Sequence, residues 1–136
     1  DRIRRNHILN VKMVHGDATE FLRFWCEDNV ADVLHLYFSD PWPKTRHHKR
    51  RVIQDATLET FHRVLKPGGI LHVVTDHEVL WEWCCEHFAR NTHLFTMSPF
   101  SSSPSAGEGE LVGTNFERKY RTEGRPFHAT TLKRVT

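Results

Sequence analysis

The chain has 136 residues, of which 38% are hydrophobic, so it can form at most one small domain with a core of its own. Its formal net charge is only +2, yet Lys and Arg cluster at residues 2–5, 44–51 and 118–134, which favours a polyanionic partner. No apolar run of transmembrane length, signal peptide or CxxC pair is present. We therefore expect a cytoplasmic protein whose cysteines (Cys26, Cys84 and Cys85) are core thiols in a reducing compartment.

The first half of the chain alternates predicted strands and helices. A short apolar strand is expected within residues 8–15, and a helix that opens at Asp17 follows it. The nearly continuous apolar run at 31–38 is typical of a strand covered on both faces in a parallel sheet. A long helix is then predicted at 52–65, ended by Pro-Gly-Gly at 67–69.

The second half continues this alternation. Residues 70–74 are expected to form the next buried strand, and helical spacing of apolar residues returns at 79–88. Composition predicts a flexible surface loop at 98–109, followed by a short helix from Thr114 and a final strand around 127–132. These elements predict an α/β fold with a doubly wound sheet, whose ligand crevice lies at the carboxyl ends of the strands.

The most informative stretch comes directly after the apolar run at 31–38. It begins Ser-Asp-Pro-Trp-Pro, with Asp40 in a loop stiffened by two prolines and Trp42 between them, and five Lys and Arg follow within eight residues. A carboxylate at a strand end, beside an aromatic ring and a block of positive charge, is typical of a site that holds a base and its phosphates. Asp17 and Asp76 also follow predicted strands, so we expect the three acids to converge on one rim.

These motifs resemble the bacterial tRNA (guanine-N(7)-)-methyltransferases over essentially the whole chain. The most specific is Asp-Pro-Trp-Pro-Lys-x-Arg-His-x-Lys-Arg-Arg at 40–51. His-Gly-Asp-Ala at 15–18, Pro-Gly-Gly-x-Leu-His-x-x-Thr-Asp at 67–76 and Thr-Asn-Phe-Glu at 114–117 support it. The resemblance implies a Rossmann-like class I methyltransferase sheet, incomplete at the N-terminus, in which residues 1–136 are the C-terminal two thirds of one domain. The family's Gly-rich cofactor turn would then lie upstream of this sequence.

The resemblance also implies a reaction and a set of site residues. The reaction is S-adenosyl-L-methionine-dependent methylation of guanine at ring nitrogen seven in tRNA, so the expected partner is tRNA. Asp40 would be the catalytic acid, and Asp17 and Asp40 the cofactor contacts. The substrate contacts would be Lys44, Asp76, Thr114, Asn115, Phe116 and Glu117. The RNA-binding run would be Arg46, His47, His48, Lys49, Arg50 and Arg51.

The same residues have plainer interpretations. Asp40 fits a turn acid before proline, and Trp42 fits either a platform for a base or a packed ring that shapes its loop. Asp17, Thr114 and Glu117 fit capping boxes at helix starts. The basic run 44–51 fits a solvated helix turn, but cations at a helix N-terminus oppose its dipole, so we expect phosphate contact instead.

Two other functions are open to a chain with these features. It could be a non-catalytic RNA-binding module that has lost the cofactor pocket, or a methyltransferase-fold enzyme for another amine or base. No His and Cys spacing matches a structural zinc site, so no metal is expected.

The fold's first strand should separate the segment near Val14 from the strand at 33–38. Without it an apolar edge would be exposed, so we expect the isolated chain to be marginally stable or aggregation-prone.

Overall fold

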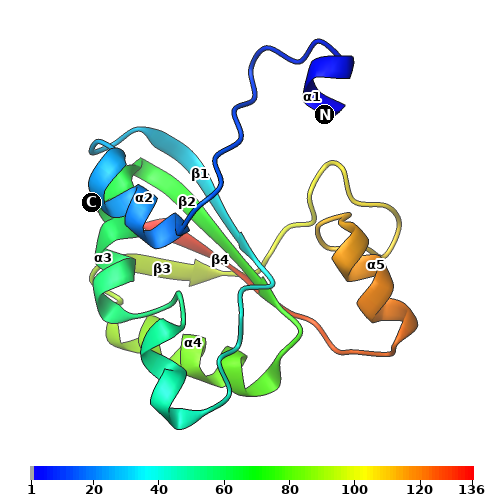
Figure 1. Cartoon of the computed structure of the whole chain (residues 1–136). Helices are drawn as coiled ribbons and strands as arrows, with labels where there is room; N and C mark the ends of the chain where they lie inside the picture. The colour runs from blue at the N-terminus through cyan, green and yellow to red at the C-terminus, as the bar shows by residue number, and fades with distance from the viewer. Residues whose placement is uncertain (1) are drawn as a thin grey trace.

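The computed structural model describes residues 2–136. Its four strands form one mixed sheet in the order β1-β2-β4-β3, in which β1 and β2 are parallel and the other two pairings are antiparallel (Figure 1). The predicted α/β class is confirmed. The elements in chain order are α1 (Arg2–Arg5), α2 (Ala18–Trp25), β1 (Ala31–Tyr37), the 3-10 helix η1 (Thr45–Arg50), α3 (Asp55–Val64), β2 (Leu65–Thr75), α4 (Glu78–Arg90), β3 (Phe95–Ser98), α5 (Asn115–Thr122) and β4 (His128–Arg134).

The hydrophobic core lies between the sheet and the helices α3 and α4. Alternate residues of a strand point to opposite faces, so Leu71 and Val73 of β2 share the face that meets the helices. They pack in one buried cluster with Phe61 of α3 and with Leu80 and Phe88 of α4. Burying a side chain of this size stabilises the fold by about 1.5–3 kcal/mol. Figure 1 shows α5 apart from this helix layer, across the ends of the strands.

The strand predicted within residues 8–15 is absent. This segment runs exposed and unpaired away from the sheet (Figure 1), with Leu9 95% and Met13 83% exposed. A strand needs a neighbour for its backbone hydrogen bonds, and within residues 2–136 the sheet ends at β1. The expected apolar edge is therefore present, because Val33 of β1 is 40% exposed.

The long helix predicted at 52–65 is shorter than expected. Residues 45–50 form η1, and α3 begins only at Asp55, after Gln54 caps it. The basic run thus does not lie at the N-terminus of an α-helix, so the dipole argument for phosphate contact fails. β2 begins directly after α3 and includes the Pro-Gly-Gly segment, while the four-residue β3 was not predicted at all.

Candidate functional site

A pocket of about 290 Å³ opens where the parallel strands β1 and β2 end. The carboxyl ends of parallel strands are where open α/β sheets bind ligands. Asp40 follows β1 and Asp76 follows β2, so two of the three predicted acids share this pocket. The full lining is Tyr37, Phe38, Ser39, Asp40, Pro41, Asp76, His77, Phe116, Tyr120 and Arg125.

The loop that carries Asp40 has a strained backbone. Phe38 and Trp42, on either side of Asp40, have φ values of +53° and +43°, a region that bulky residues rarely adopt. Strain of this kind collects at functional sites, where the surrounding structure must impose it. Arg51 supplies one restraint, since its Nε donates a 2.7 Å hydrogen bond to the Pro41 carbonyl oxygen. Within residues 2–136 the exposed Asp40 carboxylate has no ion pair or hydrogen bond, and it is therefore available to a ligand.

Asp76 is held by an arginine within the same pocket. Arg125 Nη1 lies 2.8 Å from Asp76 Oδ2, and the Asp76 side chain is 15% exposed. The Arg125 guanidinium also lies over the Tyr120 ring, 4.1 Å from its centroid. The hydrogen bond to Asp76 raises the pKa of Arg125 above its usual value. The two acids of the pocket therefore differ, because Asp40 is free and Asp76 is paired.

Asp17 does not join these two acids. Its Oδ1 accepts hydrogen bonds from the Thr19 hydroxyl and from the backbone N–H groups of Thr19 and Glu20, which caps α2 and lowers the Asp17 pKa. It lines a separate cavity of about 120 Å³ together with Val14 and Phe21. The predicted convergence of three acids is wrong for Asp17, because the segment before it does not enter the sheet.

The predicted substrate contacts at 114–117 have different positions. Phe116 lines the pocket and is 60% exposed. The Thr114 hydroxyl caps α5 by accepting from the Glu117 backbone N–H at 3.2 Å. Asn115 is exposed and accepts a hydrogen bond from Arg118. Only Phe116 of the four therefore faces the pocket.

Glu117 is fully buried beneath the loop that precedes α5. Its carboxylate accepts hydrogen bonds from the backbone N–H groups of 111–113 at 2.7, 3.1 and 3.0 Å and pairs with Arg121 at 2.9 Å. Burial acts to raise the pKa of Glu117, but these bonds outweigh it and the pKa lies below the ordinary value. Glu117 thus ties the loop to the helix.

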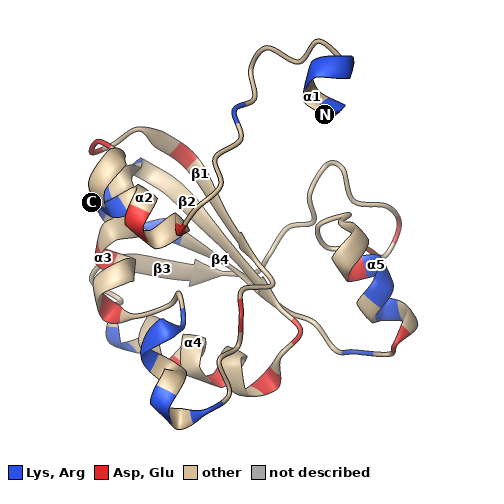
Figure 2. Cartoon of the chain, in the orientation of Figure 1, with Lys and Arg blue, Asp and Glu red and all other residues tan. Residues whose placement is uncertain are grey.

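The basic turn η1 follows the Asp40 loop and carries unpaired cations (Figure 2). Lys44, Arg46 and Lys49 are exposed and have no carboxylate partner within residues 2–136. Arg50 lies over the Trp42 ring, with its guanidinium carbon 5.0 Å from the centroid. Because this ring packs on η1 and does not line the pocket, the packing interpretation of Trp42 fits the structure better than the base platform.

The rest of the predicted RNA-binding run is less accessible. Arg51 is only 2% exposed, and its guanidinium lies 4.9 Å from the centroid of the Trp83 ring. His47 and His48 are half-buried, the first against Trp42 and the second against Trp83. Sequence reasoning missed the burial of Arg51, because a charged residue inside a basic run is normally exposed.

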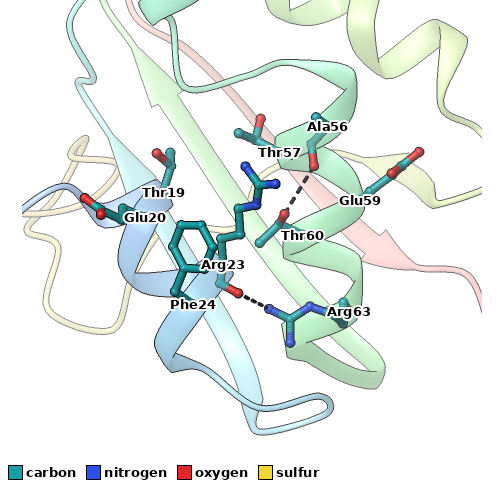
Figure 3. Close-up of a pocket in the computed structure, with 9 residues that line it drawn as sticks. All are labelled: Thr19, Glu20, Arg23, Phe24, Ala56, Thr57, Glu59, Thr60 and Arg63. Atoms are coloured by element: carbon teal, nitrogen blue, oxygen red, sulfur yellow. Dashed lines mark hydrogen bonds between the residues drawn. The ribbon is translucent and has the colours of Figure 1, made fainter.

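A larger cavity, of about 550 Å³, lies between α2 and α3 (Figure 3). Some of its polar groups are used within the protein. The Thr60 hydroxyl donates to the Ala56 carbonyl, and Arg63 donates to the carbonyls of Leu22 and Cys26. The Arg23 guanidinium of this cavity has no hydrogen bond within residues 2–136, but the cavity is lined by α2 and α3 alone. The candidate site is therefore the pocket at the carboxyl ends of the parallel strands.

Within residues 2–136 no group of three or more His, Cys, Asp and Glu side chains is placed to hold a metal ion. None of the described helices has the length and apolar character needed to cross a membrane. The three cysteines are free, and burial raises the pKa of the Cys84 thiol to about 12, as for an unreactive core thiol.

The chain belongs to a family of putative methyltransferases whose profile matches residues 1–130. A solved putative methyltransferase from Streptococcus mutans, in complex with SAH, has the same fold. It aligns with a TM-score of 0.50 and 10% sequence identity over 98% of this chain and 66% of that chain.

Two curated relatives have a more specific activity in their names than the family does. The chain is 51% identical to a tRNA (guanine-N(7)-)-methyltransferase of Corynebacterium glutamicum and 41% identical to one of Corynebacterium diphtheriae, each over 116 residues. These matches cover 85% of the chain but only 45% and 44% of the two relatives, so the chain spans less than half of their length. The family resemblance predicted from the motifs is confirmed.

Proposed function

We propose that this protein methylates guanine at ring nitrogen seven in tRNA, in the cytoplasm, with S-adenosyl-L-methionine as the methyl donor. The observation that carries the proposal is the free carboxylate of Asp40, in a pocket at the parallel strand ends and followed in sequence by the unpaired cations of η1. The similarity to tRNA (guanine-N(7)-)-methyltransferases supports it.

The proposed reaction requires stabilisation of a developing charge and does not require proton transfer. The cofactor, when bound, supplies an electrophilic methyl group on a sulfonium. Guanine N7 has a lone pair and no proton, so the chain needs no general base there. As N7 gains the methyl group the purine ring becomes positively charged, and Asp40 stabilises that charge through its unpaired carboxylate. Holding the base in line with the methyl group supplies the remaining acceleration.

The residues present fit part of a cofactor site. Asp17 uses only Oδ1 in its helix cap, and within residues 2–136 its Oδ2 accepts no hydrogen bond. Asp40 is likewise free. Although the two acids line separate cavities, their unpaired carboxylate oxygens each suit a hydroxyl or amino donor of an adenosine. We therefore assign Asp17 to the adenosine and give Asp40 a role toward both cofactor and base.

The proposed tRNA contact uses the exposed part of η1. Arg46 and Lys49 have no partner charge within the described residues, and they suit phosphates that flank the base in the pocket. Lys44, at the N-cap position of η1, extends this surface toward the Asp40 loop. Phe116, exposed at the pocket, offers an apolar face to the base.

The direct test is labelled methyl transfer to unmodified bulk tRNA by the full-length gene product, with the modified nucleoside identified. We expect the label in 7-methylguanosine. Binding of tRNA without transfer would favour the non-catalytic RNA-binding module. Label in another nucleoside, or in an amine that is not part of tRNA, would favour a methyltransferase-fold enzyme with a different substrate.

A further inference from the structure

The Arg125 side chain makes contacts with the pocket that a bound ligand could also make. Its guanidinium donates to the half-buried Asp76 at 2.8 Å and lies over the Tyr120 ring, with its central carbon 4.1 Å from the ring centroid. All three side chains line the pocket at the strand ends. A planar group with N–H donors thus lies between a carboxylate and an aromatic ring.

Guanine presents the same chemical unit on one edge. Its N1–H and N2–H₂ donors flank a single carbon, as two nitrogens flank the central carbon of a guanidinium, and a carboxylate binds such donor pairs well. Aromatic side chains also stack on bases. Asp76 and Tyr120 therefore recognise Arg125 by the features through which they would recognise guanine. Adenine has an acceptor at N1 and could not replace these donors.

We infer that Arg125 occupies the guanine subsite in the free protein and is displaced by the target base, an inference that rests on the proposed function. In this arrangement Asp76 and Tyr120 bind the N1 and N2 edge, which leaves N7 on the opposite side of the base. Asp76 makes the subsite selective, because only a base with paired donors replaces the hydrogen bonds of the displaced guanidinium, whereas Arg125 lowers the affinity for every base by the same factor.

The structure gives the displaced side chain a second partner. Arg125 Nε lies 2.8 Å from Glu123 Oε2, and both side chains are largely exposed, at 46% and 40%. The guanidinium can therefore leave Asp76 and keep a carboxylate partner in solvent. Arg125 also lies between α5 and β4, where its backbone N–H donates to the Tyr120 carbonyl oxygen at 3.1 Å. Its side chain can rotate away from Asp76 while this bond stays in place.

The test measures binding of guanosine, which has no phosphate, to the full-length protein by calorimetry. Arg125→Ala should bind guanosine roughly fivefold more tightly than the wild type, the scale of one partly exposed ion pair, and should keep the same preference for guanosine over adenosine. Arg118→Ala is the matched control, since Arg118 is on α5, pairs with Glu110 and lies outside the pocket. Its affinity for guanosine should equal that of the wild type.

Weaker binding by Arg125→Ala, or an affinity equal to that of Arg118→Ala, would overturn the inference. If Arg125→Ala does not fold, Arg125→Lys serves instead, because it keeps the charge and removes the paired donors, and it too should bind guanosine more tightly. Methyl transfer to N7 by the wild type separates the two claims. Transfer without the affinity gain refutes the role of Arg125 alone, whereas absence of both transfer and guanosine binding refutes the proposed function as well.

Discussion

The two basic segments η1 and α5 both appear as blue patches in Figure 2, but they differ in how many of their cations are paired with a carboxylate. On α5, Arg118 pairs with Glu110 and Arg121 with Glu117, and only Lys119 has no carboxylate partner within residues 2–136. On η1, Arg46 and Lys49 have no carboxylate partner within residues 2–136. A cation already paired with a carboxylate must give up that partner to bind a phosphate. The number of Lys and Arg therefore does not identify an RNA-binding surface; the number without a partner does.

Each segment is also anchored by one buried charge. Arg51 connects the end of η1 to the Asp40 loop through the Pro41 carbonyl, and Glu117 connects α5 to the loop at 111–113. We therefore expect substitutions at the two kinds of residue to have different effects. Changes at the anchors should lower stability, whereas changes at the free cations of η1 should lower tRNA affinity alone.

The largest effect is expected at the Glu117 anchor. Glu117→Ala leaves three backbone N–H groups and Arg121 without their acceptor, and we expect a loss of about 3 kcal/mol in the free energy of unfolding. Urea unfolding of the full-length protein measures it, and hydrogen exchange should show the amides of 111–113 opening. A loss below about 1 kcal/mol, the scale of an exposed pair, would contradict the assignment of Glu117 as an anchor.

The same carboxylate should make stability depend on pH. The pKa of Glu117 is lowered in the folded protein, so the unfolded chain binds its proton first as pH falls. Its stabilising contribution is then complete above the ordinary pKa of 4.5 and is lost as pH falls through the lower folded value. Glu117→Gln should lack this part of the acid dependence. If the difference in unfolding free energy between wild type and Glu117→Gln were the same at pH 6 and at low pH, this role would be contradicted.

A smaller loss is expected at Arg51. Arg51→Met removes the bond to Pro41 and the contact with Trp83, and it also removes a buried Nη2 that has no partner, so a net loss of about 2 kcal/mol in stability follows. The neighbouring Arg50→Met is the control and should stay within about 0.5 kcal/mol. Equal effects of the two substitutions would show that Arg51 is no more an anchor than Arg50.

The free cations of η1 should affect binding alone. Arg46→Ala combined with Lys49→Ala should reduce the slope of log affinity for tRNA against log salt by about 0.7–0.9 for each phosphate that these two side chains neutralise. Thermal unfolding should stay unchanged. Arg118→Ala on α5 removes a paired cation and should leave the slope nearly as it is. A larger change for Arg118 than for the η1 pair would reverse the comparison.

The parts of the fold that sequence predicted are those with strong local patterns. These patterns are the apolar runs that form β1 and β2 and the amphipathic spacing of α4, which can be recognised in the sequence alone. β3 is only four residues long, and its alternation of two apolar and two polar residues is too short to mark a strand. The segment at 8–15 has strand-like residues, but a strand exists only where a neighbour pairs with it, and no described strand does.

The site shows the same division between local and tertiary information. The order of strands placed Asp40 and Asp76 at one rim, and the motif at 40–51 marked the basic turn. Burial of Arg51 and Glu117 was not predictable, because charge in a sequence normally indicates exposure and only tertiary packing brings a partner to each. The pairing of Asp76 with Arg125, across 49 positions, likewise depends on the folded chain.

The most direct test of the proposed chemistry is the single-turnover rate of methyl transfer to tRNA by Asp40→Asn in the full-length protein, at saturating S-adenosyl-L-methionine. Asn keeps the shape of the side chain and removes the charge that stabilises the purine. The rate should fall by about a hundredfold or more, while tRNA affinity and the unfolding temperature stay at wild-type values. A rate close to that of the wild type would contradict the role of Asp40.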